Sequence, residues 1–219
     1  MTYYIENIYI CLASPLLIAI LYLRGKKQIS MFFLLIGMTS CLLSSYISTF
    51  AAAKQGLSLA GASIEMTPII EEGMKLFPIL FYLMVFEPKK EQAADEVILL
   101  AIGFVTFENA CYLLTNGAAN VLYLLIRGLG TGTMHLVCGM LVGFGLMSVW
   151  DKIYLRFAGA FSLLCTAITY HAIYNLLVSQ TGVAAMIGYL IPIVSAIALV
   201  LIRKKLTSIL LAHDQSFAL

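Results

Sequence analysis

Charged residues are scarce in this sequence. Asp, Glu, Lys and Arg make up only 11% of the 219 residues, whereas hydrophobic residues make up 62%. Soluble domains average about 45–50% apolar residues, so this chain carries more apolar side chain than a soluble domain could bury. The composition excludes an ordinary soluble protein and predicts an integral membrane protein, with the lipid bilayer as its partner.

A basic surface of the kind that binds nucleic acid is also missing. The formal net charge is only +2. Neither a basic arm nor an RNA-binding signature is present. Nucleic acid is therefore excluded as a partner.

Cysteine is sparse and poorly placed for disulfides or metal binding. An odd number of cysteines without a CxxC pair gives neither a disulfide framework nor a cysteine metal site. We expect all five to act as small apolar residues in helix packing. They are Cys11, Cys41, Cys111, Cys138 and Cys165.

Long apolar runs are what the sequence has in abundance. A helix needs about 20 mostly apolar residues to cross a bilayer. We predict an all-α, polytopic membrane helix bundle with about seven transmembrane helices, forming a single integral membrane domain over residues 1–219. The runs lie near residues 5–23, 29–53, 65–86, 97–115, 121–149, 153–178 and 183–202.

Lys and Arg residues gather in alternate connections between these runs. Basic groups at 24–27, 89–90, 152–156 and 203–205 all follow odd-numbered spans. Short cytoplasmic loops collect Lys and Arg. We therefore predict a multi-pass protein of the cell membrane with its N-terminus outside and its C-terminus in the cytoplasm.

Several polar residues interrupt the apolar runs. An ionised group near the centre of a membrane helix costs roughly 2.5–3.5 kcal/mol on the insertion scale, so such groups face the protein interior and mark functional sites. A purely structural network is disfavoured, because three carboxylates and two imidazoles also supply proton-transfer chemistry. The residues are Glu71, Glu72, Lys75, Glu108, Asn109, Arg127, His135, His171 and Asn175.

The spacing of these residues places them on shared helix faces. Positions three or four apart are neighbours, so Glu71 and Glu72 both come within reach of Lys75. One carboxylate would pair with the lysine, leaving the other for chemistry. His171 and Asn175 are four apart, so an imidazole and an amide able to bind an oxyanion point the same way.

Glycines accompany Arg127 and His135 in the fifth run. Small residues four apart, as in Gly128 and Gly132 or in Gly139 and Gly143, let helix backbones approach closely. We expect these glycines to serve helix packing. The alternative is a groove along which an extended substrate segment could lie.

Four blocks on successive spans resemble the PrsW family of intramembrane proteases, which is related more distantly to the CAAX prenyl endopeptidases. The blocks are EEGMK at 71–75, FENACY at 107–112, RGLGTGTMH at 127–135 and HAIYN at 171–175, and they indicate a catalytic core at about 65–178. The resemblance implies an endopeptidase that cuts a membrane-anchored protein substrate. In bacteria this substrate is often an anti-sigma factor in stress signalling.

The resemblance also implies roles for the residues, in a glutamic-type mechanism without a cofactor. Glu71 or Glu72, with His135, would hold and deprotonate a water, and His171 and Asn175 would stabilise the oxyanion of the tetrahedral intermediate. The supporting residues would be Lys75, Glu108, Asn109, Tyr112 and Arg127, with Glu108 and Arg127 orienting the imidazoles or the substrate.

A zinc mechanism is the main alternative. Glu108, His135 and His171 would form a His₂Glu ligand set with an open water position. The HExxH signature is absent, and no two histidines lie four apart. We therefore favour the metal-free mechanism and keep Zn²⁺ as the alternative. A different class of function, a small proton-coupled transporter or channel, would also use buried ionisable residues.

Counting along the spans predicts the depth of the site. Glu71, Glu108 and His171 each lie a few residues from the outer end of their run, within roughly 9–12 Å at 1.5 Å per residue. His135 shares this depth only if the membrane begins near Arg127. We therefore expect cleavage near the extracytoplasmic side.

Overall fold

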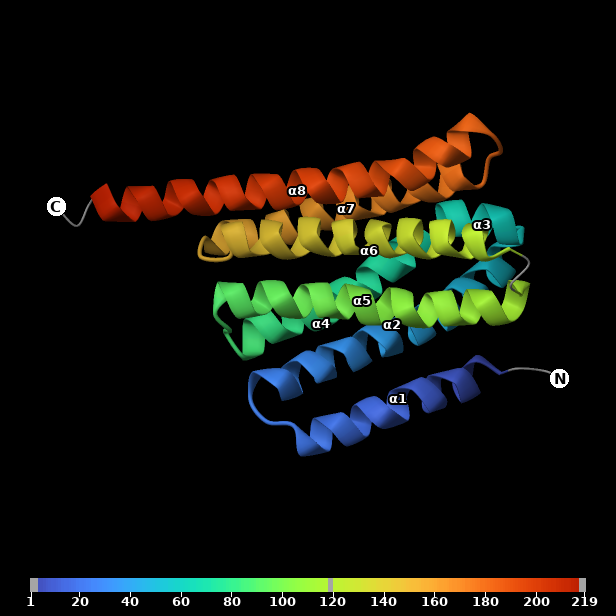
Figure 1. The fold of residues 1–219 in the computed structure, drawn as a ribbon, viewed down its shortest axis with the longest axis horizontal. Coiled ribbons are helices and arrows are strands. Elements are labelled where there is room, and N and C mark those ends of the chain that lie inside the picture. Colours follow the sequence, from blue (N-terminus) through green and yellow to red (C-terminus); the bar gives the residue numbers. More distant parts are fainter. Residues whose placement is uncertain (1–3, 118–119, 217–219) are drawn as a thin grey trace.

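The computed structural model describes residues 4–117 and 120–216; within its helices, the side chains at 59–60, 91, 116 and 203–216 are not described. The described chain forms a helical bundle (Figure 1). Its elements are α1 (Ile5–Tyr22), α2 (Lys26–Gln55), α3 (Leu59–Glu65), α4 (Thr67–Val85), α5 (Lys90–Asn116), α6 (Val121–Val149), α7 (Ile153–Val178) and α8 (Val183–Ser216).

Six of the described helices are long and apolar enough to cross a membrane, namely α1, α2, α5, α6, α7 and α8 as far as Ile202. The predicted span at 65–86 is different. It forms the 19-residue helix α4, whose residues Glu71, Glu72 and Lys75 are all buried. This helix packs against α2, α5, α6 and α7. The predicted polytopic helical bundle is confirmed. Six of the seven predicted runs meet the length and composition of a membrane helix, and the run at 65–86 differs because α4 buries its charged side chains against other helices.

The connections between the helices alternate between the two ends of the bundle (Figure 1). The α1–α2, α4–α5 and α6–α7 connections lie at the end where the C-terminus emerges. The α2–α3, α5–α6 and α7–α8 connections lie at the other end, beside α3 and the N-terminus. The predicted basic groups at 24–27, 89–90 and 152–156 therefore share one end, which we call the basic end. The predicted group at 203–205 lies outside the described side chains.

Glycines bring α2 and α5 into backbone contact. A Cβ atom added at Gly37 would lie 2.0 Å from the carbonyl oxygen of Leu100, and one added at Gly103 would lie 2.0 Å from that of Leu34. No larger residue fits at either position without moving a helix. This crossing fixes the place of α5, which carries Glu108 two turns further on.

Helices α5 and α6 are close toward the basic end and separate toward the α3 end. A Cβ at Gly143 would lie 2.7 Å from a side-chain carbon of Val97, and one at Gly139 would meet an α5 side chain at 3.1 Å. At Gly128 and Gly132 an added Cβ would have no atom within 4 Å. The packing predicted for these glycines is confirmed at Gly139 and Gly143 and wrong at Gly128 and Gly132. The space left between the helices is taken by polar side chains.

Candidate active site

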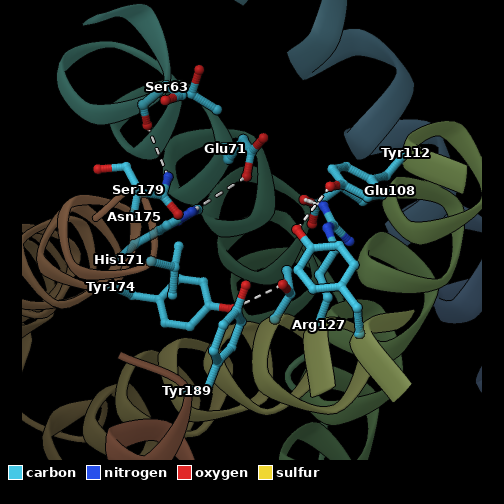
Figure 2. Close-up of a pocket in the computed structure, with 14 residues that line it drawn as sticks. Ser63, Glu71, Glu108, Tyr112, Arg127, His171, Tyr174, Asn175, Ser179 and Tyr189 are labelled. Carbon is cyan, nitrogen blue, oxygen red and sulfur yellow. Dashed lines mark hydrogen bonds and ion pairs between the residues drawn. The ribbon is translucent and has the colours of Figure 1, made fainter. Parts of the chain in front are cut away.

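The predicted site residues come together toward the α3 end of the bundle. A cavity of about 290 Å³ opens there, and its walls are built from α3 to α8 (Figure 2). Pro68, in the first turn of α4, is compatible with a helix start at this point because its missing N–H would have no helical partner. This start puts Glu71 on the cavity wall within about one turn of the helix end.

Glu72 is the carboxylate that pairs with the lysine. Lys75 Nζ donates to Glu72 Oε1 at 2.6 Å, and His171 Nδ1 lies 2.8 Å from the same oxygen. Because an ionised carboxylate only accepts, His171 carries its proton on Nδ1 and keeps a free lone pair on Nε2. Glu72 therefore holds His171 in the tautomer that can bind a water proton or a metal.

Glu71 is the carboxylate left for chemistry. Its Oε2 atom lies 3.8 Å from His171 Nε2 and 3.9 Å from His135 Nε2. The two imidazole rings meet edge to face, with centroids 5.0 Å apart. Polar atoms separated by such distances are commonly bridged by a water. One carboxylate and two imidazoles therefore converge on a space at the cavity wall.

His135 has a polar partner at each ring nitrogen. Nδ1 lies 2.9 Å from Lys75 Nζ, and Nε2 lies 2.7 Å from Glu108 Oε2. A lysine ammonium has only donors, so Nδ1 accepts and Nε2–H donates to Glu108. Glu108 thus contacts one of the imidazoles that it was expected to orient, and the orienting role stays a prediction. His135 also reaches the level of Glu71, although it lies deep within α6.

The cluster has the composition of a metal site. Glu71, His135 and His171 each offer a ligand atom, and these atoms lie within 4.8 Å of one another. A His₂Glu set is typical of catalytic zinc, and the carboxylate of Glu72 behind His171 is a common partner of a ligating histidine. The residues fit a metal on one condition: the proton of His135 must move from Nε2, where it is donated to Glu108, to Nδ1, so that Lys75 no longer donates to Nδ1. The ligand set predicted from the sequence had Glu108 in the place of Glu71.

Arg127 forms a second polar cluster between α5 and α6. It donates to Asn109 Oδ1 at 2.5 Å and approaches Glu108 Oε1 at 3.5 Å. Its guanidinium carbon lies 3.4 Å from the ring centroid of Tyr112, which is hydrogen-bonded to Tyr123. The predicted supporting residues thus gather where the two helices separate, and they place a positive charge beside Glu108.

Asn175 lines the cavity and also connects two helices. Its Nδ2 donates to the backbone carbonyl of Ser63 in α3 at 2.8 Å (Figure 2). One of its two N–H groups is therefore used to hold α3 against α7. The oxyanion role expected for Asn175 stays a prediction that depends on the other N–H.

Among the cavity residues that the sequence did not predict, two contact each other. Tyr174 and Thr131 line the cavity, and their hydroxyl oxygens lie 2.9 Å apart. Tyr174 follows His171 by three residues, so a shared helix face was the available signal. Tyrosine is frequent throughout this chain, with 12 residues, and the signal did not stand out.

Membrane-length helices that enclose carboxylates and imidazoles below one end of the bundle are the arrangement expected of an intramembrane hydrolase. The comparison with protein families specifies it further. Residues 25–202 match the model described as PrsW family intramembrane metalloprotease. The chain belongs to this family, and it is a multi-pass intramembrane protease. Searches of curated proteins and of solved structures give no match.

Proposed function

We propose that this protein cuts a membrane-anchored protein in the extracytoplasmic half of the bilayer, with a water activated between Glu71, His135 and His171. The observation that carries this proposal is the position of Glu71 Oε2, within 3.9 Å of Nε2 of both histidines. An anti-sigma factor is a candidate substrate, which rests on the family resemblance alone.

Glu71 is suited to act as general base. It is the buried carboxylate of α4 that is not paired with Lys75, so it is available to take a proton from water. The hydroxide would attack the carbonyl carbon of the substrate, and the oxygen of that carbonyl would become an oxyanion. Glu71 would then give the proton to the leaving amine as the C–N bond breaks.

The other charged residues hold the imidazoles in place. Glu72 keeps the proton of His171 on Nδ1, and Glu108 fixes the ring of His135. Lys75 offsets the charge of Glu72. Positioning of this kind lets the site stabilise developing charge without reorganising during the reaction.

Glu71, His135 and His171 are also the residues that would hold a zinc ion. When bound, the metal would polarise the substrate carbonyl and lower the pKa of a bound water. Glu71 would then be a ligand, and Glu108 would be the carboxylate remaining beside it on the cavity wall.

Metal analysis of the purified protein separates these two forms of the mechanism. In the zinc mechanism, the wild type holds one zinc per chain, and His171→Ala and Glu71→Ala each lose both the zinc and cleavage. Chelation abolishes cleavage by the wild type, and added Zn²⁺ restores it. Full cleavage in chelator by a metal-free sample would assign Glu71 as the base.

The side of cleavage follows from the two ends of the bundle. Glu71 lies four residues inside α4 and His171 seven residues before the end of α7, or roughly 6 and 10 Å in depth at 1.5 Å per residue. Both residues lie at the end opposite the basic connections. Because short cytoplasmic loops collect Lys and Arg, we assign this end to the outside.

Mapping the new termini of a cleaved single-span substrate in liposomes tests the proposal. We expect a cut in the outer half of its span or just beyond it, absent with Glu71→Gln. A cut on the cytoplasmic side would contradict the orientation. Cleavage that Glu71→Gln retains would contradict the choice of site.

A further inference from the structure

We propose that Tyr174 is a further catalytic residue, whose phenol O–H, held by Thr131, donates a hydrogen bond to the substrate carbonyl oxygen as it becomes the oxyanion. The inference rests on the proposed peptide hydrolysis at Glu71 and deepens it.

Tyr174 lies beside the reacting groups. It follows His171 by one turn of α7, and both residues line the same cavity as Glu71 (Figure 2). Its side chain is 4% exposed and that of Thr131 is 6% exposed. The phenol is therefore an almost fully buried polar group at the cavity that would receive the substrate.

The hydrogen bond between the two hydroxyls leaves one O–H donor without an acceptor. Tyr174 and Thr131 each bring one O–H, and a single hydrogen bond of 2.9 Å joins them. Within the described part of the chain, neither hydroxyl makes another hydrogen bond. Leaving a buried donor without an acceptor costs roughly 1–3 kcal/mol. A water or a substrate oxygen in the cavity is the acceptor that the surroundings offer.

The phenol is held rigidly at this position. Its ring meets that of Tyr189 edge to face, with centroids 6.2 Å apart. Gly130 makes room for both tyrosines, because a Cβ atom there would lie 2.5 Å from Tyr189 Cδ1 and 3.3 Å from Tyr174 Oη. A donor fixed before the substrate arrives stabilises an oxyanion without a reorganisation cost during the reaction.

Asn175 has only part of its amide available to bind the oxyanion. One of its N–H groups donates to the carbonyl of Ser63, so its amide is tied to α3. Tyr174 adds a donor that depends on no contact with α3. In the reaction the bond from the water oxygen forms as the carbonyl π electrons move to oxygen. The phenol keeps its proton throughout, and the leaving amine receives the proton held by Glu71.

Tyr174→Phe removes this donor and little else. We expect kcat for a reconstituted single-span substrate to fall about 10²–10³-fold, the effect typical of losing one oxyanion donor, with KM within about threefold of the wild type. Tyr170→Phe makes the same change one turn earlier on α7, outside the cavity wall, and should keep wild-type kinetics. A kcat within threefold of the wild type, or a change in KM alone, would overturn the role.

Thr131 supplies an independent variant if Tyr174→Phe does not fold. Thr131→Val keeps the shape of the side chain but removes the partner of the phenol, and should lower kcat about tenfold at unchanged KM. Thr131→Ser keeps the hydroxyl and should recover most of that loss. Equal kinetics for the two variants would overturn the role of the pair. Full cleavage by Glu71→Gln would instead contradict the proposed function itself.

Discussion

The two halves of the bundle bury carboxyl groups in different surroundings. Toward the α3 end, Glu72 accepts from Lys75 and His171. Toward the basic end, Glu96 of α5 is 2% exposed and accepts from the Ser30 hydroxyl at 3.2 Å. Its Oε2 has no partner among the described residues. A buried charge is maintained by a paired cation. The half in which a buried carboxylate is paired with a cation is the half that holds the proposed site.

The largest difference between the halves should be in activity. We expect Glu71→Gln to lower the rate of substrate cleavage by more than about 10³-fold, because it removes the group that takes the proton from water. Glu96→Gln is the matched control, since it makes the same change in a buried carboxyl of the other half. Both are measured with one substrate in liposomes. Similar losses for the two variants would show that burial of any carboxyl, rather than its place, supports cleavage.

The buried ion pair should dominate stability. Lys75→Met leaves Glu72 without its cation in a site where both side chains are at most 5% exposed. Removing one partner of such a pair typically costs about 3–5 kcal/mol.

The exposed pair Lys90–Asp151 at the basic end gives the control, because its side chains are 48% and 73% exposed. Lys90→Met should cost about 1 kcal/mol or less. Thermal unfolding in detergent measures both variants. Equal shifts in Tm would mean that Glu72 loses its charge when the lysine is removed.

The separation of α5 from α6 toward the α3 end can be tested with one glycine of α6 from each half of the bundle. Gly143→Ala places a methyl group 2.7 Å from a carbon of Val97, and this overpacking should cost about 1–3 kcal/mol. Gly132→Ala enters open space and should stabilise α6 by up to about 1 kcal/mol, since alanine favours the helix. Opposite signs in the two Tm shifts are expected. Destabilisation by both variants would indicate that the helices close together at the α3 end as well.

The sequence predicted the helices, and which polar residues lie together, better than it predicted the contacts between those residues. Helix spacing was sufficient to show that either Glu71 or Glu72 would pair with Lys75, because three and four residues both span one turn. The choice of Glu72 depends on His171, which lies 99 residues later in the chain and contacts the same oxygen. Local spacing carries no information on such a contact.

Glycine spacing had a similar limit. Gly128, Gly132, Gly139 and Gly143 give the same local pattern, yet the first two face open space and the last two face α5. What an added methyl group would meet is decided by the neighbouring helix. Arg127 and Asn109 connect α5 and α6 at the α3 end, where no glycine brings the helices into contact. These two residues are 18 positions apart, so a local pattern could not predict their contact either.

The smallest effect should come from Glu96 itself. A carboxyl that is buried with a single neutral donor contributes little as a charge, because a buried carboxylate without a cation costs several kcal/mol. Gln keeps an acceptor for the Ser30 hydroxyl and has nearly the same shape, so Glu96→Gln should leave Tm unchanged or slightly raised. Glu96→Leu removes the acceptor and should cost about 1–3 kcal/mol by leaving that hydroxyl unsatisfied. If Glu96→Gln instead lowered Tm as much as Lys75→Met, Glu96 would be a charged partner of some group, and the contrast between the two halves would not hold.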